Sequence, residues 1–323
     1  MHQFLISVDW GTSNFRLVLF NASRQKIVDS LNTEYGAKKL YARCKNSETS
    51  SKQVFFTYLK KQLKGIAQES LSNIPICISG MASSSIGIRE LPYAKLPFDS
   101  TGEGLLIEEI KTDLVPNPVY LISGVCDQQD IMRGEEVQLI GLFAQNPGIS
   151  TGIFILPGTH SKHIYCRDQR IQSFETFMTG ELFELLQKHS LLANSIERKN
   201  FGAREKLAFE RGIVLGNAGD KLLHHLFSIR ARDLINNEIK SDAFYFLSGL
   251  LIGNELSSKS LRKSKEIYIV AKGQIQQLYL LAIKKLLPTH KIRVFPETQM
   301  EKAVPLGQLK ISQRLLGYFE HKL

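Results

Sequence analysis

Hydrophobic and polar positions along the chain predict strands first and helices later. Apolar runs at residues 3–9, 15–21 and 26–33 are separated by short polar turns, which is the pattern of a β-meander. Residues 54–70 then carry apolar groups at helical spacing, and residues 74–79 form a short apolar run that ends in glycine and serine. The chain is therefore predicted to open with a sheet, followed by a helix and a further buried strand.

The second half repeats this order, with a meander followed by helices. Strands are predicted at 119–123, 153–156, 163–166, 171–174, 267–270 and 292–295, and helices at 131–143, 179–191, 205–229, 243–256, 274–287 and 306–318. Residues 41–53 are polar and predicted to form a loop. Prolines cluster within residues 91–118, which predicts a boundary between a domain at 1–116 and a domain at 117–323. The last helix is expected to pack back on the first domain.

Composition places the chain among ordinary globular proteins. Its 323 residues, 43% hydrophobic and 22% charged, are enough for two domains with substantial cores. It contains no apolar run of the roughly 18 to 20 residues that a membrane span requires, and it begins directly with a strand pattern, so a cytoplasmic protein is expected. The four cysteines are widely spaced and form no metal-binding motif, so they are expected to be reduced thiols.

The net charge of +10 could indicate a nucleic-acid partner. The basic residues are dispersed, however, and the densest group, at residues 38–45, is interpreted as a solvated loop. No nucleic-acid or membrane partner is therefore expected. A basic surplus also suits an enzyme with anionic ligands, because a positive field raises their local concentration.

A Gly-Thr turn joins the first two predicted strands, in the sequence Asp9-Trp10-Gly11-Thr12-Ser13-Asn14-Phe15-Arg16. Gly11 lets backbone N–H groups approach a phosphate closely, and the hydroxyls of Thr12 and Ser13 add small donors. Asp9, at the end of the strand, is placed to hold Mg²⁺, and Arg16 could meet a transferring phosphoryl group. Taken alone, the same residues also fit a simple β-hairpin with a polar turn.

A second Gly-Thr turn occurs about 150 residues later, in Pro157-Gly158-Thr159-His160-Ser161-Lys162, again between apolar runs. Two such turns, one in each half, suggest two loops that close on one phosphate chain. Gly158 and Thr159 would approach the phosphates, and His160 and Lys162 could contact phosphate oxygens. A structural role for His160 is equally compatible with the sequence. The chain contains neither a GxxxxGK[ST] motif nor a GxGxxG motif, which argues against P-loop and Rossmann folds.

Together the two turns resemble those of the actin, hexokinase and Hsp70 superfamily, whose two domains clamp ATP between them. Nearly the whole chain resembles the 2-dehydro-3-deoxygalactonokinase family. The residues that carry this resemblance are Asp9-Trp10-Gly11, Gly80-Met81, Pro92-Tyr93 with Pro97, Met132-Arg133-Gly134-Glu135-Glu136, Leu156 to Lys162, Thr179-Gly180-Glu181-Leu182, Arg230-Ala231 and Leu247 to Gly253.

The resemblance implies a two-domain α/β fold of the ribonuclease H-like type, with a nucleotide cleft between the domains. It also implies ATP and Mg²⁺ as cofactors, and transfer of the γ-phosphate to the 6-hydroxyl of 2-dehydro-3-deoxy-D-galactonate. Ile88 and Ser83-Ser84-Ser85 depart from the family pattern. The choice between galactonate-derived and gluconate-derived acids, or another sugar, therefore stays open. The nucleotide preference and the oligomeric state stay open too. A regulator that binds a nucleotide or sugar without catalysis is a further alternative.

Transfer to an alcohol needs a carboxylate that accepts its proton. Asp127, Asp130 and Glu135 precede the second turn. Glu135 is slightly favoured, because its distance from Gly158 resembles the spacing between base and phosphate loop in related sugar kinases. Asp127 resembles their catalytic residue by local sequence. Helix N-capping is the alternative role for Asp127 and Asp130.

Further binding residues follow from the same comparison. Arg133 and Arg89 are candidates for a bidentate contact with the substrate carboxylate. Arg133 is favoured because it belongs to the family motif, whereas a surface role fits Arg89 equally well. Met81 belongs to the substrate-side motif. Gly273, between a predicted strand and helix, is expected to border the adenosine. Gly249 and Gly253 are better explained by close helix packing than by catalysis.

Overall fold

The chain folds into two compact units in the computed structural model, which describes residues 3–45, 48–66 and 71–316. Unit 1 comprises Met1–Ser150, Arg167–Ser173 and Pro296–Leu323, and unit 2 comprises Thr151–Cys166 and Phe174–Phe295. The expected boundary after residue 116 falls inside unit 1. The strand just beyond it pairs in register with a strand of the central sheet, at Ile76↔Val119, so the chain continues in the same unit.

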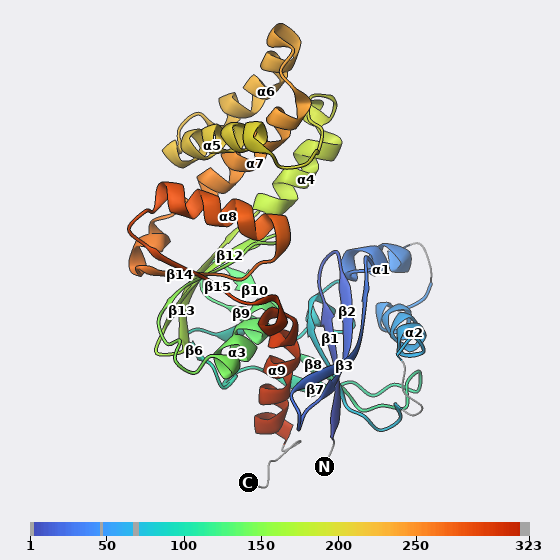
Figure 1. Cartoon of the computed structure of the whole chain (residues 1–323). Helices are drawn as coiled ribbons and strands as arrows, with labels where there is room; N and C mark the ends of the chain where they lie inside the picture. Colours follow the sequence, from blue (N-terminus) through green and yellow to red (C-terminus); the bar gives the residue numbers. More distant parts are fainter. Residues whose placement is uncertain (1–2, 46–47, 67–70, 317–323) are drawn as a thin grey trace. The chain divides into compact units, whose positions relative to one another are not determined.

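Unit 1 is built on a six-stranded sheet of order β3-β2-β1-β4-β8-β7 and a three-stranded sheet of order β10-β9-β5. Its elements are β1 (Phe4–Trp10), β2 (Phe15–Asn21), β3 (Lys26–Thr33), α1 (Ala37–Lys45), α2 (Ser51–Leu63), β4 (Ile76–Gly80), η1 (Met81–Ser83), β5 (Ala94–Lys95), β6 (Phe98–Asp99), β7 (Ile107–Glu109), β8 (Val119–Ile122), β9 (Val125–Cys126), β10 (Ile131–Met132), α3 (Glu135–Gln145) and α9 (Glu297–Leu316). The helices α1 and α2 lie on one side of the β1–β3 meander (Figure 1).

Successive side chains of β1 point alternately to the two faces of the sheet. Ile6, Val8 and Trp10 pack in a core with α2 residues such as Phe55, whereas Asp9 lies on the opposite face. On that second face α9 contacts β1 and β4. The Gln308 amide of α9 donates to the Val8 carbonyl and to the Ser79 hydroxyl, both at 2.9 Å. The C-terminal helix is thus fastened next to the ends of β1 and β4.

Unit 2 carries a sheet of order β15-β14-β11-β12-β13. Its elements are β11 (Gly152–Leu156), β12 (Ser161–Arg167), β13 (Arg170–Phe177), α4 (Thr179–His189), η2 (Leu191–Asn194), α5 (Ala203–Ala218), α6 (Leu222–Asn236), α7 (Lys240–Glu255), η3 (Lys259–Lys263), β14 (Glu266–Ile269), α8 (Gly273–Leu286) and β15 (Lys291–Val294). The turn that joins β12 to β13 belongs by its contacts to unit 1, where Arg170 and Ile171 pair with β6.

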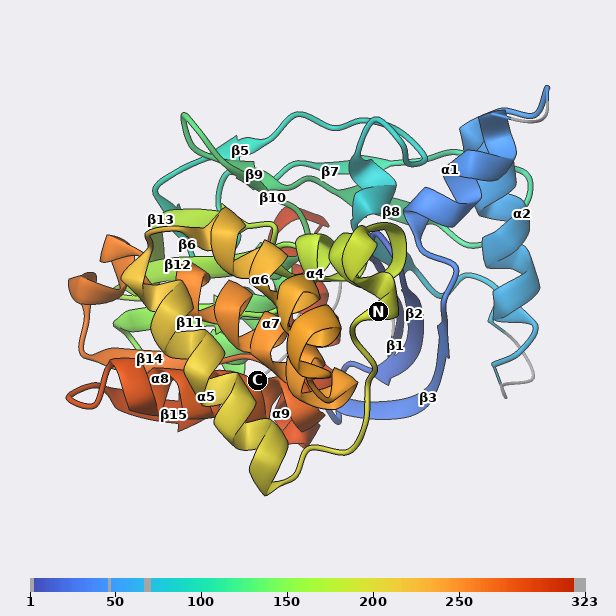
Figure 2. The same ribbon diagram turned by 90° about the horizontal axis from the view of Figure 1, so that it is seen from above.

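The helices α5 and α7 run side by side in unit 2 (Figure 2) and pack through glycines. A Cβ atom at Gly249 would lie 2.1 Å from the Phe209 carbonyl oxygen, and one at Gly253 would lie 2.3 Å from that of Ile213. Only glycine permits this approach of two backbones. The prediction that Gly249 and Gly253 serve helix packing is confirmed.

The pattern predicted the main strands correctly, but four helical segments differ. Residues 41–53 are not one loop, because α1 extends to Lys45 and α2 begins at Ser51. Ala37 and Leu40 are the buried apolar residues of α1, too few to give a periodic signal, while Lys38 and Lys39 are exposed.

The predicted helix at 205–229 is two helices, since Gly219 and Lys221 have φ values of 77° and 56°, outside the helical region. The helix predicted at 131–143 begins only at Glu135, because Gly134 has φ 113° and residues 131–132 form β10. The helix predicted at 306–318 begins earlier, at Glu297. The ends of the helices predicted at 54–70 and 306–318 include residues outside the described part.

Candidate active site

Three elements of unit 1 meet at the C-terminal ends of β1 and β4. These strands are parallel, and Asp9 lies beside Ser79 and Trp10 beside Gly80. A Cβ atom at Gly80, whose φ is 86°, would lie 2.6 Å from the Trp10 carbonyl oxygen and 3.4 Å from Asp9 Oδ1. A Cβ atom at Gly134 would lie 3.3 Å from the Gly80 Cα and 4.0 Å from the same carboxylate oxygen. Asp9, Gly80 and the start of α3 therefore share one small space.

Three charged side chains, those of Asp9, Arg16 and Glu135, interact at this place. Arg16 lies directly opposite Asp9 in the β1–β2 register, and its buried Nε has no hydrogen-bond partner among the described residues. Burial raises the pKa of Asp9 to about 6; Arg16 lowers this value and the Glu135 charge raises it. The structure thus brings together Asp9, Arg16 and Glu135, three residues that the sequence placed in a phosphoryl-transfer site.

The first Gly-Thr turn is held by the beginning of α1. The backbone N–H groups of Gly36, Ala37 and Lys38 donate to the carbonyls of Ser13, Gly11 and Thr12 at 3.0, 2.9 and 3.1 Å. In a trans peptide the N–H and C=O point in opposite directions, so the N–H groups that follow these carbonyls point away from α1. Binding of an anion at the turn would require N–H groups that are free of α1 in this way.

Gly36 supports the first Gly-Thr turn and was not among the residues predicted from the sequence. A Cβ atom there would lie 2.4 Å from the backbone of Thr12 and Ser13, so α1 can approach the turn only through a glycine. A glycine before a helix was the available signal, but the helix itself was not predicted.

The start of α3 carries two carboxylates in different surroundings. Glu135 Oε2 accepts from the Arg133 N–H at 3.0 Å and remains partly exposed. Both carboxyl oxygens of Glu136 accept from the Gly134 N–H, at 2.8 and 2.9 Å, and this residue is fully buried. Burial and the neighbouring Glu135 charge raise the pKa of Glu136 to about 8.

Asp127 and Asp130 lie elsewhere, in the turn between β9 and β10. Asp127 Oδ1 accepts from the backbone N–H groups of Gln129 and Asp130, both at 2.7 Å, and Asp130 Oδ1 accepts from Ile131 at 2.8 Å. The alternative role in helix N-capping is therefore wrong, because both residues lie in a β-turn between two strands and not at the start of a helix.

The two arginine candidates have different partners. Arg133 is buried, donates to the backbone and side chain of Ser83 and to the Leu91 carbonyl, and lies 4.1 Å from the centroid of the Tyr93 ring. It thereby ties β10 to the segment that follows Met81. Arg89 is exposed and forms an ion pair with Glu108.

The second Gly-Thr turn, in unit 2, is held by the beginning of α4. A Cβ atom at Gly180 would lie 2.2 Å from the Gly158 carbonyl oxygen, and the Glu181 N–H donates to the Thr159 carbonyl at 2.9 Å. The Glu181 carboxylate also bonds His160 Nε2 at 2.7 Å. His160 is thus fixed beside the turn with its ring partly exposed, while Lys162 is buried on β12.

An apolar pocket of about 520 Å³ extends from this turn into unit 2. It is lined by Pro157, Gly158, Thr159, Thr179, Gly180, Phe183, Arg198, Phe244, Tyr245, Ser248, Leu251, Ile252, Gln274, Ile275, Leu278 and Tyr279. Apolar walls with a few polar groups at one end are typical of a site for a flat heterocycle joined to a polar chain. Gly273 begins α8 directly before the lining residue Gln274, with open space where a Cβ atom would be.

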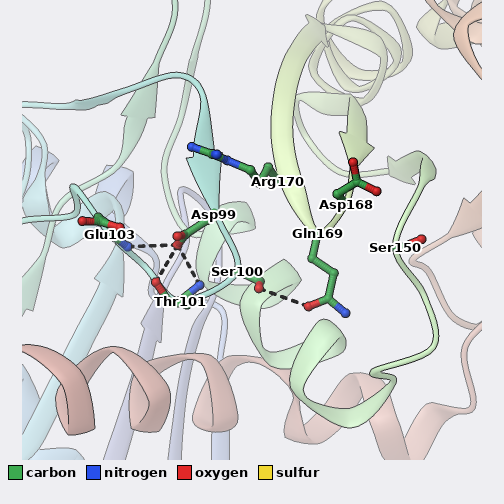
Figure 3. Close-up of a pocket in the computed structure, with 8 residues that line it drawn as sticks. All are labelled: Asp99, Ser100, Thr101, Glu103, Ser150, Asp168, Gln169 and Arg170. Atoms are coloured by element: carbon green, nitrogen blue, oxygen red, sulfur yellow. Dashed lines mark hydrogen bonds between the residues drawn. The ribbon is translucent and has the colours of Figure 1, made fainter.

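A second hollow, in unit 1, is polar and open (Figure 3). Its side chains hold one another: Asp99 Oδ1 accepts from the Thr101 backbone and hydroxyl at 2.9 and 2.6 Å, and Ser100 bonds Gln169 at 3.2 Å. These bonds show that Asp99, Ser100, Thr101 and Gln169 support a loop and a hairpin turn.

The described residues contain no group of three or more His, Cys, Asp and Glu side chains arranged to hold a metal ion. Mg²⁺ does not need one, because it commonly takes one or two carboxylates and completes its shell with phosphate oxygens and water. Asp9 fits this donor set, since a cation would relieve the cost of its buried charge beside Glu135. Along the same described residues, no helix has both the length and the apolar character needed to cross a membrane.

Solved structures define the class of protein. A crystal structure described as a candidate 2-dehydro-3-deoxygalactonokinase from Sinorhizobium meliloti superposes with a TM-score of 0.83 at 26% identity, over 98% of this chain and 99% of that one. Xylulose kinase from Lactobacillus acidophilus shares the fold at a TM-score of 0.53 and 13% identity, over 98% of this chain and 90% of that one. The protein therefore has the two-domain fold of actin- and hexokinase-like sugar kinases, which confirms the predicted fold class.

Sequence comparison narrows this class to a family. The sequence model of 2-keto-3-deoxy-galactonokinase matches residues 9–303. The 2-dehydro-3-deoxygalactonokinase of Escherichia coli (strain K12) is 31% identical over 78% of this chain and 79% of its own length. A Rhizobium meliloti (strain 1021) protein named as a probable 2-dehydro-3-deoxygalactonokinase, DgoK1, is 29% identical over 87% of this chain and 89% of its own length. The chain belongs to the 2-keto-3-deoxy-galactonokinase family, as its sequence motifs predicted, and is a kinase.

Proposed function

We propose that the protein transfers the γ-phosphoryl group of ATP to the 6-hydroxyl of 2-dehydro-3-deoxy-D-galactonate. Membership of the family supports this substrate. The observation that carries the proposal is the convergence of Asp9, Arg16 and Glu135 beside a glycine-lined turn in unit 1. Because the reaction consumes ATP in the breakdown of a sugar acid, we place it in the cytoplasm.

In this proposal the two turns receive the phosphates. Gly11, Thr12 and Ser13 act from unit 1, and Gly158 and Thr159 act from unit 2. His160, which bonds Glu181 beside the turn, and Lys162 on β12 contact the phosphate oxygens in this proposal. The apolar pocket of unit 2 holds the adenosine, with Gly273 at its border.

Glu135 is the proposed base that takes the proton of the sugar hydroxyl. It is partly exposed at the start of α3, and its charge is coupled to Asp9. Asp127 and Asp130 remain alternatives, although their carboxylates already cap the β9–β10 turn. Arg16, whose Nε lacks a partner among the described residues, stabilises the transferring group.

Asp9 holds Mg²⁺ in the proposal, and bound Mg²⁺ would neutralise charge on the phosphates. The sugar acid lies near Met81. Arg133 supports that side of the site by holding Ser83 and Leu91, whereas Arg89 would have to exchange Glu108 for the substrate carboxylate.

The proposal is tested by ADP release from purified protein, ATP and Mg²⁺ with a panel of 2-keto-3-deoxy acids and aldonic acids. We expect the highest kcat/KM with the galactonate-derived acid. A clearly higher kcat/KM for the gluconate-derived acid would identify that acid as the substrate instead. Absence of ADP release with every acceptor would overturn the kinase function.

A further inference from the structure

A buried carboxylate in unit 2 connects the elements that surround the proposed nucleotide pocket. Glu255 ends α7, and 1% of its side chain is exposed. Its Oε1 accepts from Ser161 Oγ at 2.7 Å and His163 Nε2 at 2.8 Å. Its Oε2 accepts from the Tyr279 hydroxyl at 2.7 Å and from the Thr179 hydroxyl. Four donors thus converge on one side chain.

These donors belong to the parts that shape the pocket and the second turn. Ser161 is the first residue of β12, directly after the turn. Thr179 is the first residue of α4; the next residue, Gly180, packs closely against Gly158, and Glu181 donates its N–H to the Thr159 carbonyl. Tyr279 lies on α8 and, like Thr179, lines the pocket. Glu255 therefore joins β12, α4, α7 and α8.

The network suits an ionised carboxylate. Burial alone would raise the pKa of Glu255, but the hydrogen bonds and charge of His163, with further bonds from Thr179 and Ser161, hold it below its usual value. A carboxylate only accepts hydrogen bonds, so four donors can be satisfied together. An amide at this position would bring two N–H donors to face hydroxyl donors.

We propose that Glu255 is a positioning residue that fixes the second Gly-Thr turn against the adenosine pocket, and so sets the affinity for ATP. The inference rests on the proposed function, because it concerns the nucleotide side of the same reaction. Glu255 does not line the pocket itself and acts through Ser161, Thr179 and Tyr279.

Glu255→Gln tests the inference through two measurements that report on the nucleotide. Calorimetry gives the Kd for ADP, and steady-state kinetics give separate KM values for ATP and the sugar acid. We expect the Kd for ADP and the KM for ATP to rise about tenfold, since a hydrogen bond to a charged group is lost or reversed. The KM for the sugar acid should change by less than about twofold, a split that general destabilisation would not produce.

Glu205→Gln is the matched control. Glu205 is also buried in unit 2 and accepts from Ser241 at 3.0 Å, but it lies on α5 and contributes nothing to the pocket lining. The control should lower the melting temperature and leave the Kd for ADP unchanged. Equal losses of ADP affinity in both variants would overturn the inference, because they would show a general effect of removing a buried charge.

Thr179 provides a second test if Glu255→Gln does not fold. Thr179→Val removes the hydroxyl and keeps the shape, while Thr179→Ser keeps the hydroxyl. We expect weaker ADP binding only in the valine variant, and equal binding in both would contradict the inference. If the wild type binds ADP but phosphorylates no acceptor, the proposed function fails while the role of Glu255 in nucleotide affinity can still be measured.

Discussion

The two Gly-Thr turns are supported alike, but the carboxylates beside them are not. In each unit the beginning of a helix holds the turn through a glycine, with Gly36 before α1 and Gly180 in α4. In unit 1, burial raises the pKa of Asp9 to about 6 and that of Glu136 to about 8. In unit 2, Glu255 accepts four hydrogen bonds and its pKa is lowered.

This difference separates reactive groups from structural ones. Carboxylates whose charge is poorly compensated are typical of sites that await a cation or a proton, whereas a fully satisfied carboxylate stabilises the fold. We infer that unit 1 supplies the charged groups that take part in phosphoryl transfer, and that unit 2 supplies a rigid nucleotide pocket.

The largest effect is expected from Glu135→Gln. Loss of a positioned base lowers kcat by about 10²- to 10⁴-fold, which an ADP-release assay measures. Circular dichroism should show an unchanged fold. Asp127→Asn is the matched control, and it should retain most activity because Asp127 caps a surface turn. Full activity in Glu135→Gln would move the base to Asp127 or Asp130.

Asp9→Asn should separate activity from stability. Removing the proposed Mg²⁺ ligand lowers kcat by about 10²-fold or more. The pKa of Asp9 is raised above its ordinary value, so its ionisation opposes folding, and this cost is fully present above about pH 6. The ligand-free variant should therefore melt a few degrees higher than the wild type near neutral pH. A lower melting temperature would show that neighbouring groups already compensate the Asp9 charge in the folded protein, and the contrast with Glu255 would then be wrong.

Glu136→Gln should have a smaller effect that depends on pH. The folded protein binds the Glu136 proton up to about pH 8, while the unfolded chain releases it near its ordinary pKa of 4.5. The contribution of this group to the free energy of unfolding is therefore fully present below about pH 4.5, and it is lost as the pH rises through about 8. Glutamine cannot ionise, so the variant should melt higher than the wild type at about pH 9 and similarly at about pH 4. A difference that is the same at both pH values would contradict this interpretation.

Arg89→Ala should have the smallest effect. The side chain is exposed and paired with Glu108, and exposed ion pairs contribute little. A change of about twofold in the KM for the sugar acid is expected. A much larger rise in KM, with kcat unchanged, would show that Arg89 leaves Glu108 to bind the substrate carboxylate.

The main strands and the two Gly-Thr turns could be predicted because nearly continuous apolar runs, such as those of β1 and β11, lead into a turn that contains glycine. The helix α1 could not, since nine residues with two buried apolar side chains give no clear period. The division between α5 and α6 was missed for a different reason: left-handed backbone at Gly219 and Lys221 interrupts an otherwise helical pattern.

The candidate site was only partly predictable. Motifs placed Asp9, Arg16 and Glu135 in one site, and the structure brings them together in unit 1. The pocket of unit 2 could not be predicted, because Phe183, Arg198, Tyr245 and Gln274 reach it from separate elements. Their proximity is set by the packing of helices and not by local sequence.

A single-turnover reaction with ATP labelled in its γ-phosphate tests the central claim most directly. Excess enzyme is mixed with labelled ATP, Mg²⁺ and 2-dehydro-3-deoxy-D-galactonate, and the labelled product is identified by chromatography and mass spectrometry. We predict that the label appears in the 6-phosphate of the acid with the wild type, and is transferred far more slowly with Glu135→Gln. Label in inorganic phosphate alone, or equal transfer by both proteins, would contradict the account.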